Sequence, residues 1–339
     1  MKNKGLWVSY FILGMCLITF FGYGVGSANQ TSTKTSTKTS TTVKKVGVLQ
    51  YVSHPALDSI YKGVIQGLKD NGYEEGKNLE LLFQNGQADQ SKLATMSQQL
   101  VNKQADVLVG IATPAAQALA NATQDIPIVL GAVTDPVGAN LVKDMDKPGG
   151  NITGVSDKAP IKAQIELAKT LLSEAKTMGI LYSSAEDNSK YQVAEAKKAA
   201  EALGFTVKTY AVPSTNEISQ TVQVMSQETD FIYIPLDNTI ANAMPSVVAT
   251  ADQSNTPIIP SVDTMVEQGG LATVGINQFD LGVQTGKMVT DILNGASPAT
   301  TPVYTFTKGD TILNLEQAKK LGITIPEAIE KSATIVGGE

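Results

Sequence analysis

The sequence contains no arginine: all 26 of its basic residues are lysines. A bound anionic group must therefore be held by lysines, hydroxyls or backbone N–H groups rather than by a guanidinium. Histidine and cysteine occur once each, as His54 and Cys16. One of each cannot assemble a Cys/His zinc site, and a single cysteine cannot form a disulfide within the chain.

Two motifs that cradle phosphate or carry a nucleophile are also missing. The chain has no Gly-x4-Gly-Lys-Ser/Thr loop and no Gly-x-Ser-x-Gly elbow, and its Gly-x-Gly at residues 22–24 lies in an apolar leader. His54 and Asp58 are four residues apart, which is ordinary helical spacing. Neither nucleotide binding nor a serine-triad enzyme is therefore expected.

Negative charge exceeds positive charge, with 32 acidic residues against 26 lysines. The first 45 residues hold six lysines and no acid, so the remaining 20 lysines face 32 acids and leave a net charge of −12. A phosphate backbone attracts the opposite sign, so nucleic acid is not an expected partner. The length of 339 residues predicts two domains.

The first 28 residues have the pattern of a signal peptide or membrane anchor. Lys2 and Lys4 precede an apolar run over residues 6–25, which is long enough to span a membrane and directs the following chain outward. Small residues at 26–28 suit a signal peptidase, so cleavage and retention are both compatible with the pattern. Cys16 is a candidate for lipidation, although Met15 stands where a small residue is usual.

Residues 29–45 are rich in threonine, serine and lysine. Such a segment has nothing apolar to bury and is expected to be a disordered linker. The protein is therefore predicted to be exported to the outer face of the cytoplasmic membrane, either anchored there or released after cleavage.

From residue 46 onward, short β-branched runs alternate with helical patterns, which predicts parallel sheets with crossover helices. Expected strands cover residues 46–51, 79–84, 107–110 and 126–130, and then 178–182, 205–210, 231–234, 257–259 and 271–276. A Pro-Gly-Gly cluster at 148–150 separates the two series. After a break at 294–298, residues 303–306 and 311–315 are expected to form a strand pair. We predict an α/β fold of two lobes between which the chain crosses more than once.

Ligands of open α/β sheets bind beyond the carboxyl ends of the strands. In the first lobe, His54, Thr113 and Asp135 each follow a predicted strand and precede a proline, which predicts three helix starts at one rim. Unpaired N–H groups and the helix dipole attract a carboxylate there. Simple helix capping is the alternative interpretation at each position.

Polar residues also follow the predicted strands of the second lobe: Tyr182, Ser183, Asp187, Asn188, Asp237, Asn238 and Asp263. An acid at this rim, Asp237 or Asp263, is a candidate to receive an ammonium group, with helix capping again the alternative. The tyrosines at 51, 182 and 191 offer flat apolar faces.

Five stretches resemble the tryptophan/tyrosine-type family of solute-binding proteins that serve bacterial ABC importers: HPALD (54–58), GYEEGKN (72–78), TPAA (113–116), DPV (135–137) and PGGNITGV (148–155). The resemblance extends over residues 46–321. It implies two doubly wound parallel-sheet lobes joined by a three-crossing hinge, which is the type I periplasmic binding protein fold. The expected lobes are residues 46–153 with 276–302, and residues 154–275 with 303–339.

The resemblance further implies a monomer that binds an aromatic amino acid between its lobes, with tryptophan preferred over tyrosine and phenylalanine. It implies an ABC permease with its ATPase as partner, and neither enzymatic activity nor a cofactor. The residues that it places at the cleft are Gln50, Tyr51, His54, Thr113, Pro114, Thr134, Asp135, Tyr182, Ser183, Asp237, Asn238 and Asn277. We expect the carboxylate at the Thr113 helix start, the ammonium at Asp237 or Asp135, and the aromatic ring on Tyr51 or Tyr182.

Other functions compete with this one. A bilobal sensor that reports to a membrane receptor, or a binder of another small polar solute, fits the same sequence. An α/β enzyme lacks a visible nucleophile, metal set or phosphate loop. The effector half of a transcription factor does not fit, because the amino terminus is a hydrophobic leader and not a DNA-binding head.

Overall fold

The computed structural model describes residues 43–337, all of which lie in one compact unit. The predicted leader at 1–28 and Cys16 lie outside the described residues, as does the predicted linker up to residue 42. Within 43–337, no helix combines the length and the apolar character needed to cross a membrane.

Six parallel strands form the first sheet, in the order β11-β5-β4-β3-β1-β2. Their bounds are β1 Lys44–Gln50, β2 Leu79–Asn85, β3 Val107–Ile111, β4 Ile128–Gly131, β5 Ile152–Ser156 and β11 Tyr304–Thr305. Strands β3, β4 and β5 are buried along their whole length. Apolar runs of this kind are typical of parallel strands covered on both faces.

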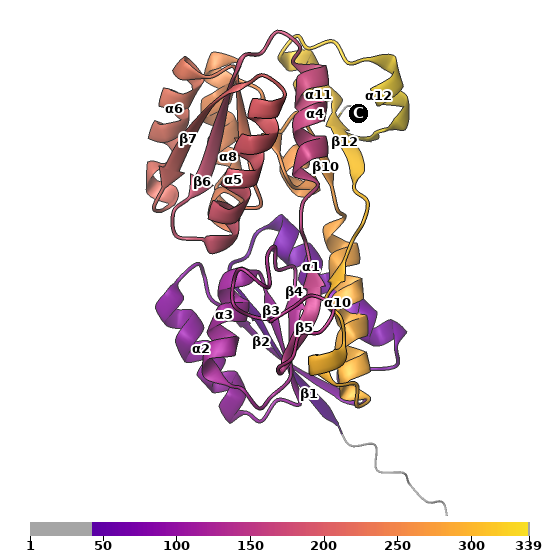
Figure 1. Cartoon of the computed structure of the whole chain (residues 1–339). Coiled ribbons are helices and arrows are strands. Elements are labelled where there is room, and N and C mark those ends of the chain that lie inside the picture. The colour runs from indigo at the N-terminus through magenta and orange to yellow at the C-terminus, as the bar shows by residue number, and fades with distance from the viewer. Residues whose placement is uncertain (1–42, 338–339) are drawn as a thin grey trace, which may run out of the picture. The chain divides into compact units, whose positions relative to one another are not determined.

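Four helices cover this sheet: α1 Pro55–Asp70, α2 Gln90–Asn102, α3 Thr113–Ala122 and α10 Gln278–Leu293. Helices α2 and α3 lie on one face, and α1 and α10 lie on the other (Figure 1). Leu57, Ile60, Val64 and Leu68 of α1 are buried at three- and four-residue spacing, so one stripe of the helix packs inward.

The second sheet is also parallel, in the order β7-β6-β8-β9. Its strands are β6 Thr177–Ser183, β7 Thr206–Val212, β8 Phe231–Ile234 and β9 Ile258–Pro260. The accompanying helices are α4 Ile161–Leu171, α5 Asp187–Ala202, α6 Ile218–Glu228, α7 Asn238–Asn242, α8 Met244–Ala251 and α9 Asp263–Glu267.

A third, mixed sheet has the order β10-β12-β13, with strands β10 Ala272–Gly275, β12 Asp310–Asn314 and β13 Thr334–Val336. Strands β10 and β12 are antiparallel. The remaining helices are α11 Leu315–Lys320 and α12 Glu327–Ser332, with 3-10 turns η1 Thr215–Glu217, η2 Asp252–Ser254 and η3 Pro298–Thr300. The predicted pairing of 303–306 with 311–315 is wrong, because β11 pairs with β5 and β12 pairs with β10.

Two separate hydrophobic cores divide the described chain. We call the first sheet with α1, α2, α3 and α10 the first lobe, and the other two sheets with their helices the second lobe. The chain passes between the lobes three times, after β5, after β10 and after β11. The predicted α/β fold with two parallel-sheet lobes and three crossings is confirmed.

Strand β5 was not among the expected strands, and it spans the lobe boundary predicted between residues 153 and 154. The helix predicted at Asp135 is also wrong. Residues 136–140 form turns instead, Asp135 Oδ1 accepts the N–H of Gly138 at 2.9 Å, and Asn140 adopts a positive φ of 58°. A left-handed residue ends a right-handed turn, so the helix cannot continue.

Helices α1 and α10 approach each other backbone to backbone. Gly63 and Gly67 of α1 face Gly282 and Gly286 of α10, and a Cβ atom at any of the four would clash with backbone atoms of the opposite helix. This close packing fixes the two helices together on one face of the first sheet.

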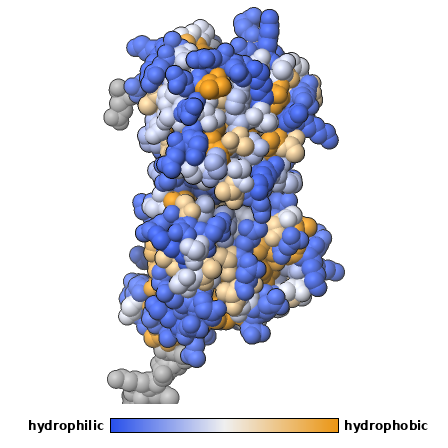
Figure 2. Space-filling model, turned by 90° about the vertical axis from the view of Figure 1, so that its left-hand side faces the viewer, coloured by the Kyte–Doolittle hydropathy of each residue, from blue (hydrophilic) through white to orange (hydrophobic). Residues whose placement is uncertain are grey.

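The face of the molecule drawn in Figure 2 is mainly hydrophilic, with hydrophobic residues scattered in small groups. Scattered apolar residues are normal on a protein surface. The buried apolar side chains concentrate in the two cores.

Candidate functional site

A small cavity of about 30 Å³ has walls from both lobes. The first lobe contributes His54, Leu57, Ala112, Thr113, Ala132 and Thr134. The second lobe contributes Asn188, Leu236, Asp237, Asn238 and Val262. Asp157, which follows β5 where the chain first leaves the first lobe, lines the same cavity.

A second cavity of about 190 Å³ shares Thr113 and Asn188 with the first. Its wall also includes Asp135, Asp187 and Tyr191. The two cavities therefore adjoin, and Thr113 and Asn188 lie at the boundary between them.

Helix α3 begins at the small cavity without a side-chain cap. Its N-cap residue, Ala112, makes no side-chain hydrogen bond and has a positive φ of 73°. The first N–H groups of a helix have no partner within the helix, and they carry the positive end of its dipole. This end of α3, at Thr113, is therefore suited to a negatively charged group.

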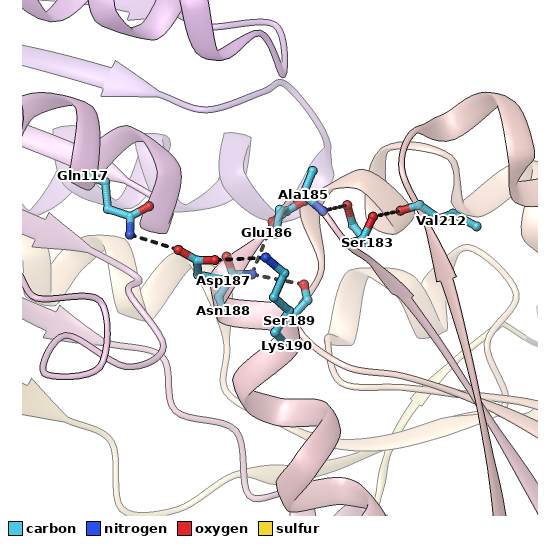
Figure 3. Close-up of polar contacts among 10 residues, drawn as sticks. Gln117, Ser183, Ala185, Glu186, Asp187, Asn188, Ser189, Lys190 and Val212 are labelled. Atoms are coloured by element: carbon cyan, nitrogen blue, oxygen red, sulfur yellow. Dashed lines mark hydrogen bonds and ion pairs between the residues drawn. The ribbon is translucent and has the colours of Figure 1, made fainter.

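Hydrogen bonds between side chains connect the lobes at the cavities. His54 Nε2 lies 3.2 Å from Asn238 Oδ1, and Gln117 Nε2 donates to Asp187 Oδ2 at 3.4 Å (Figure 3). Burial lowers the pKa of His54, although the hydrogen bond to Asn238 opposes the shift. A neutral imidazole that faces an amide oxygen must carry its proton on Nε2.

Glu186 organises the second-lobe side of the cavity. Its carboxylate is fully buried and accepts the backbone N–H and the hydroxyl of Thr239, both at 2.8 Å. Asn238 Nδ2 also donates to Glu186, at 2.6 Å. These bonds hold the start of α7 and orient the Asn238 oxygen toward His54.

Asp237 uses both carboxylate oxygens within the fold. Oδ2 accepts the backbone N–H of Ser183 at 2.5 Å, and Oδ1 accepts that of Ile240 at 2.9 Å. Burial raises the pKa of Asp237, and the negative charge of Glu186 raises it further. Asp237 therefore caps α7 and ties it to β6, with no oxygen left fully free.

The two tyrosines predicted to stack on a ligand do not line this cavity. Tyr51 is buried, and burial, with the charge of Glu186, raises the pKa of its hydroxyl. Tyr182 is half-buried on β6. The apolar part of the wall consists instead of alanines together with Leu57, Leu236 and Val262.

The structure brings five of the predicted ligand residues to the small cavity: His54, Thr113, Thr134, Asp237 and Asn238. Asp135 lines the adjoining cavity, and Ser183 contacts Asp237 from behind. Gln50 is fully buried and donates to Asp58 at 2.7 Å. Pro114 lines a different cavity, beside α2. Asn277 is exposed and caps α10 by accepting the N–H of Asp280 at 3.0 Å.

Sequence reasoning missed Asp157, Glu186 and Gln278. Asp157 follows the carboxyl end of β5, so it would have been noticed had that strand been recognised. Burial raises its pKa to about 6, and the Thr134 side chain opposes this shift. Within residues 43–337, no cluster of three or more His, Cys, Asp or Glu side chains is arranged to hold a metal ion.

Comparison with known proteins identifies the family. Residues 45–336 match the ABC transporter substrate binding protein family. A tyrosine-binding protein of Clostridioides difficile is 38% identical over 310 residues, covering 91% of this chain and 89% of that protein. The chain belongs to the ABC transporter substrate binding protein family.

Two solved structures of family relatives resemble this one. An ABC domain from Streptococcus pneumoniae in complex with L-Trp is 56% identical and has a TM-score of 0.85. The match covers 87% of this chain and 100% of that chain. The second is the ligand-free, open structure of a substrate binding protein with adhesive properties from Clostridium difficile. It is 39% identical and has a TM-score of 0.68, and the match covers 88% of this chain and 100% of that chain. The family's fold is that of type I periplasmic binding proteins, as the sequence predicted.

Proposed function

We propose that this protein is the extracytoplasmic binding component of an ABC importer. In this proposal it captures an aromatic amino acid, tryptophan in preference to tyrosine, and delivers it to a membrane permease. The observation that carries the proposal is the cavity with walls from both lobes, in a chain whose relatives include a tyrosine-binding protein and an L-Trp complex.

The ligand carboxylate is assigned to the start of α3. Because the chain has no arginine, backbone N–H groups and the Thr113 hydroxyl are the donors available there, and Ala112 provides no competing cap. Such a helix start binds anions without a cationic side chain.

The aromatic ring is assigned to the apolar wall of Leu57, Leu236 and Val262. Burying about 200 Å² of indole contributes roughly 5 kcal/mol, whereas micromolar affinity needs about 8 kcal/mol. The charged ends of the ligand must therefore be matched as well.

The cavity of about 30 Å³ has room for about one or two water molecules, so it cannot hold the whole ligand with the lobes placed as they are. We infer that the ligand enters with the lobes apart and stabilises their closure, because a ligand that touches both lobes favours the closed state. The permease would then recognise the closed form.

Calorimetric titration of the protein with L-tryptophan, L-tyrosine and L-phenylalanine tests the proposal. We expect saturable heat, with tryptophan binding most tightly. Absence of heat with all three, together with binding of a sugar, would remove the assignment to aromatic amino acids.

A further inference from the structure

Asn188 lines the cavity and has an unused hydrogen-bond acceptor. Its Nδ2 donates to the backbone oxygen of Leu236 at 2.9 Å and to Glu186 Oε2 at 3.2 Å, and Figure 3 shows Asn188 beside Glu186 and Ser189. Because these neighbours are acceptors, the amide cannot be flipped, and its oxygen must point the other way. That oxygen, Oδ1, is buried and has no hydrogen-bond partner among the described residues.

Asp157 lines the same cavity and has a second unused acceptor. Its Oδ1 is also buried and also lacks a hydrogen-bond partner within the described chain. No lysine lines the cavity, so no cation of residues 43–337 neutralises this carboxylate there. Buried polar groups are almost always paired, and two unpaired acceptors in one cavity indicate a ligand that brings donors.

The other acids near the cavity already accept hydrogen bonds from the fold. Asp237 accepts two backbone N–H groups, and Glu186 accepts bonds from Thr239 and Asn238. Asp135 Oδ1 accepts the N–H of Gly138. Asp157 is therefore the acid whose buried oxygen is left for a ligand.

Building on the proposed function, we propose that Asp157 and Asn188 together receive the ammonium group of the ligand, and that the site therefore also binds aromatic primary amines that lack a carboxylate. An ammonium group has three N–H donors and a positive charge, which match one charged and one neutral acceptor. A cavity of about 30 Å³ is large enough for such a group, since one water needs about 10 to 15 Å³.

The two ends of the amino acid then differ in importance. Removing the carboxylate leaves only the helix start of α3 unmatched, and water can hydrate it. Removing the ammonium leaves the Asp157 carboxylate without a counter-charge and Asn188 Oδ1 without a donor, and an uncompensated carboxylate is a costlier loss than unpaired neutral N–H groups. The site thus selects for the amine and against aromatic acids without one.

Calorimetric titration with L-tryptophan, tryptamine and indole-3-propionate separates these classes. We expect tryptamine to bind within about 100-fold of tryptophan, and indole-3-propionate to bind at least about 1,000-fold more weakly than tryptophan. Binding of the acid as tight as that of the amine would overturn this inference while leaving the proposed function intact. If tryptophan itself does not bind, the proposed function fails.

Two variants test the assigned residues. Asp157→Asn is expected to weaken tryptophan and tryptamine at least about 100-fold and to leave indole-3-propionate unchanged or improved. Asn188→Ala is expected to weaken both amines about 10-fold, because Leu236 O keeps hydrogen bonds from Gln192 and Ser189 and the fold is preserved.

Asp125→Asn is the matched control, because Asp125 is an exposed acid of the first lobe that lines neither cavity. It should bind all three compounds as the parent protein does. A general structural defect would weaken all three compounds alike in Asp157→Asn, whereas ammonium recognition changes the ratio of amine to acid affinity. An unchanged ratio in that variant would overturn the assignment of Asp157.

Discussion

His54 Nε2 lies 3.2 Å from Asn238 Oδ1, so the single histidine of the chain connects the start of α1 in the first lobe to the start of α7 in the second. Because Asn238 Nδ2 is held by Glu186 at 2.6 Å, the amide is oriented before the lobes meet. This contact can form only when the lobes are together.

His54→Ala is predicted to weaken tryptophan binding about 2- to 10-fold, the usual net contribution of one hydrogen bond. The affinity falls because the variant lacks the His54–Asn238 hydrogen bond, which stabilises the closed arrangement of the lobes. Gln117→Ala removes a second side-chain hydrogen bond between the lobes, which is long at 3.4 Å and exposed, and should change the affinity less than about 2-fold. Calorimetry of both variants checks the order, and a larger effect of Gln117→Ala would contradict it.

Tryptophan binding should weaken as pH falls below about 6, because burial raises the pKa of Asp157 to about 6 and an ammonium group binds the ionised carboxylate. The bound ammonium lowers this pKa, so the complex holds fewer protons than the free protein. The affinity is therefore highest above the pKa of Asp157 in the ligand-free protein, and it falls by up to about tenfold for each pH unit below that pKa.

Titrations at about pH 5 and about pH 8 measure this dependence. Asp157→Asn should have weak affinity that is the same at both values. Equal affinity of the parent protein at the two pH values would show that Asp157 does not pair with the ligand.

Asp157→Asn should make the ligand-free protein more stable near neutral pH. An aspartate with a folded-state pKa of about 6 keeps its proton to a higher pH in the folded than in the unfolded state. Its contribution to the free energy of unfolding is therefore present at low pH and is lost as pH rises through about 6. Asparagine does not ionise, and the gain is on the order of 1 to 3 kcal/mol above that pH. Urea unfolding at about pH 8 and about pH 4 tests this, because the difference should vanish at the lower pH.

Most of the fold could be predicted because its strands are apolar, β-branched runs separated by helical patterns. Strands β2, β3 and β8 lie within one residue of the expected ranges. Strand β5 was missed because its sequence ITGVS closely follows the turn signal Pro-Gly-Gly at 148–150 and includes two hydroxyl residues. Its Gly154 is needed there because a Cβ would clash with Leu130. The partners of β11 and β12 depend on contacts far along the chain, which local patterns do not encode.

The candidate site was predictable where a polar residue follows a recognised strand, as at Thr113, Thr134 and Asp237. The roles of these residues were not, because a residue type does not reveal whether its oxygens are already used. Asp237 and Asp157 are both aspartates after a strand, yet one accepts two backbone N–H groups and the other has an unpaired oxygen. Tyr51 illustrates the converse, since an aromatic residue at the rim proved to be buried in the fold.

The packing of α1 against α10 predicts that Gly282→Ala is strongly destabilising. The added Cβ would clash with the backbone oxygen of Ile60, and neither helix can move without disturbing the first core. We expect a loss on the order of 2 to 4 kcal/mol in the free energy of unfolding, measured by urea denaturation. Gly150→Ala is the control, because a Cβ there meets nothing within 4 Å, and it should change stability by less than about 0.5 kcal/mol. Equal stability of the two variants would mean that the helices do not touch through their backbones. Side chains alone would then have to fix α10, whose first residue Gln278 lines the cavity.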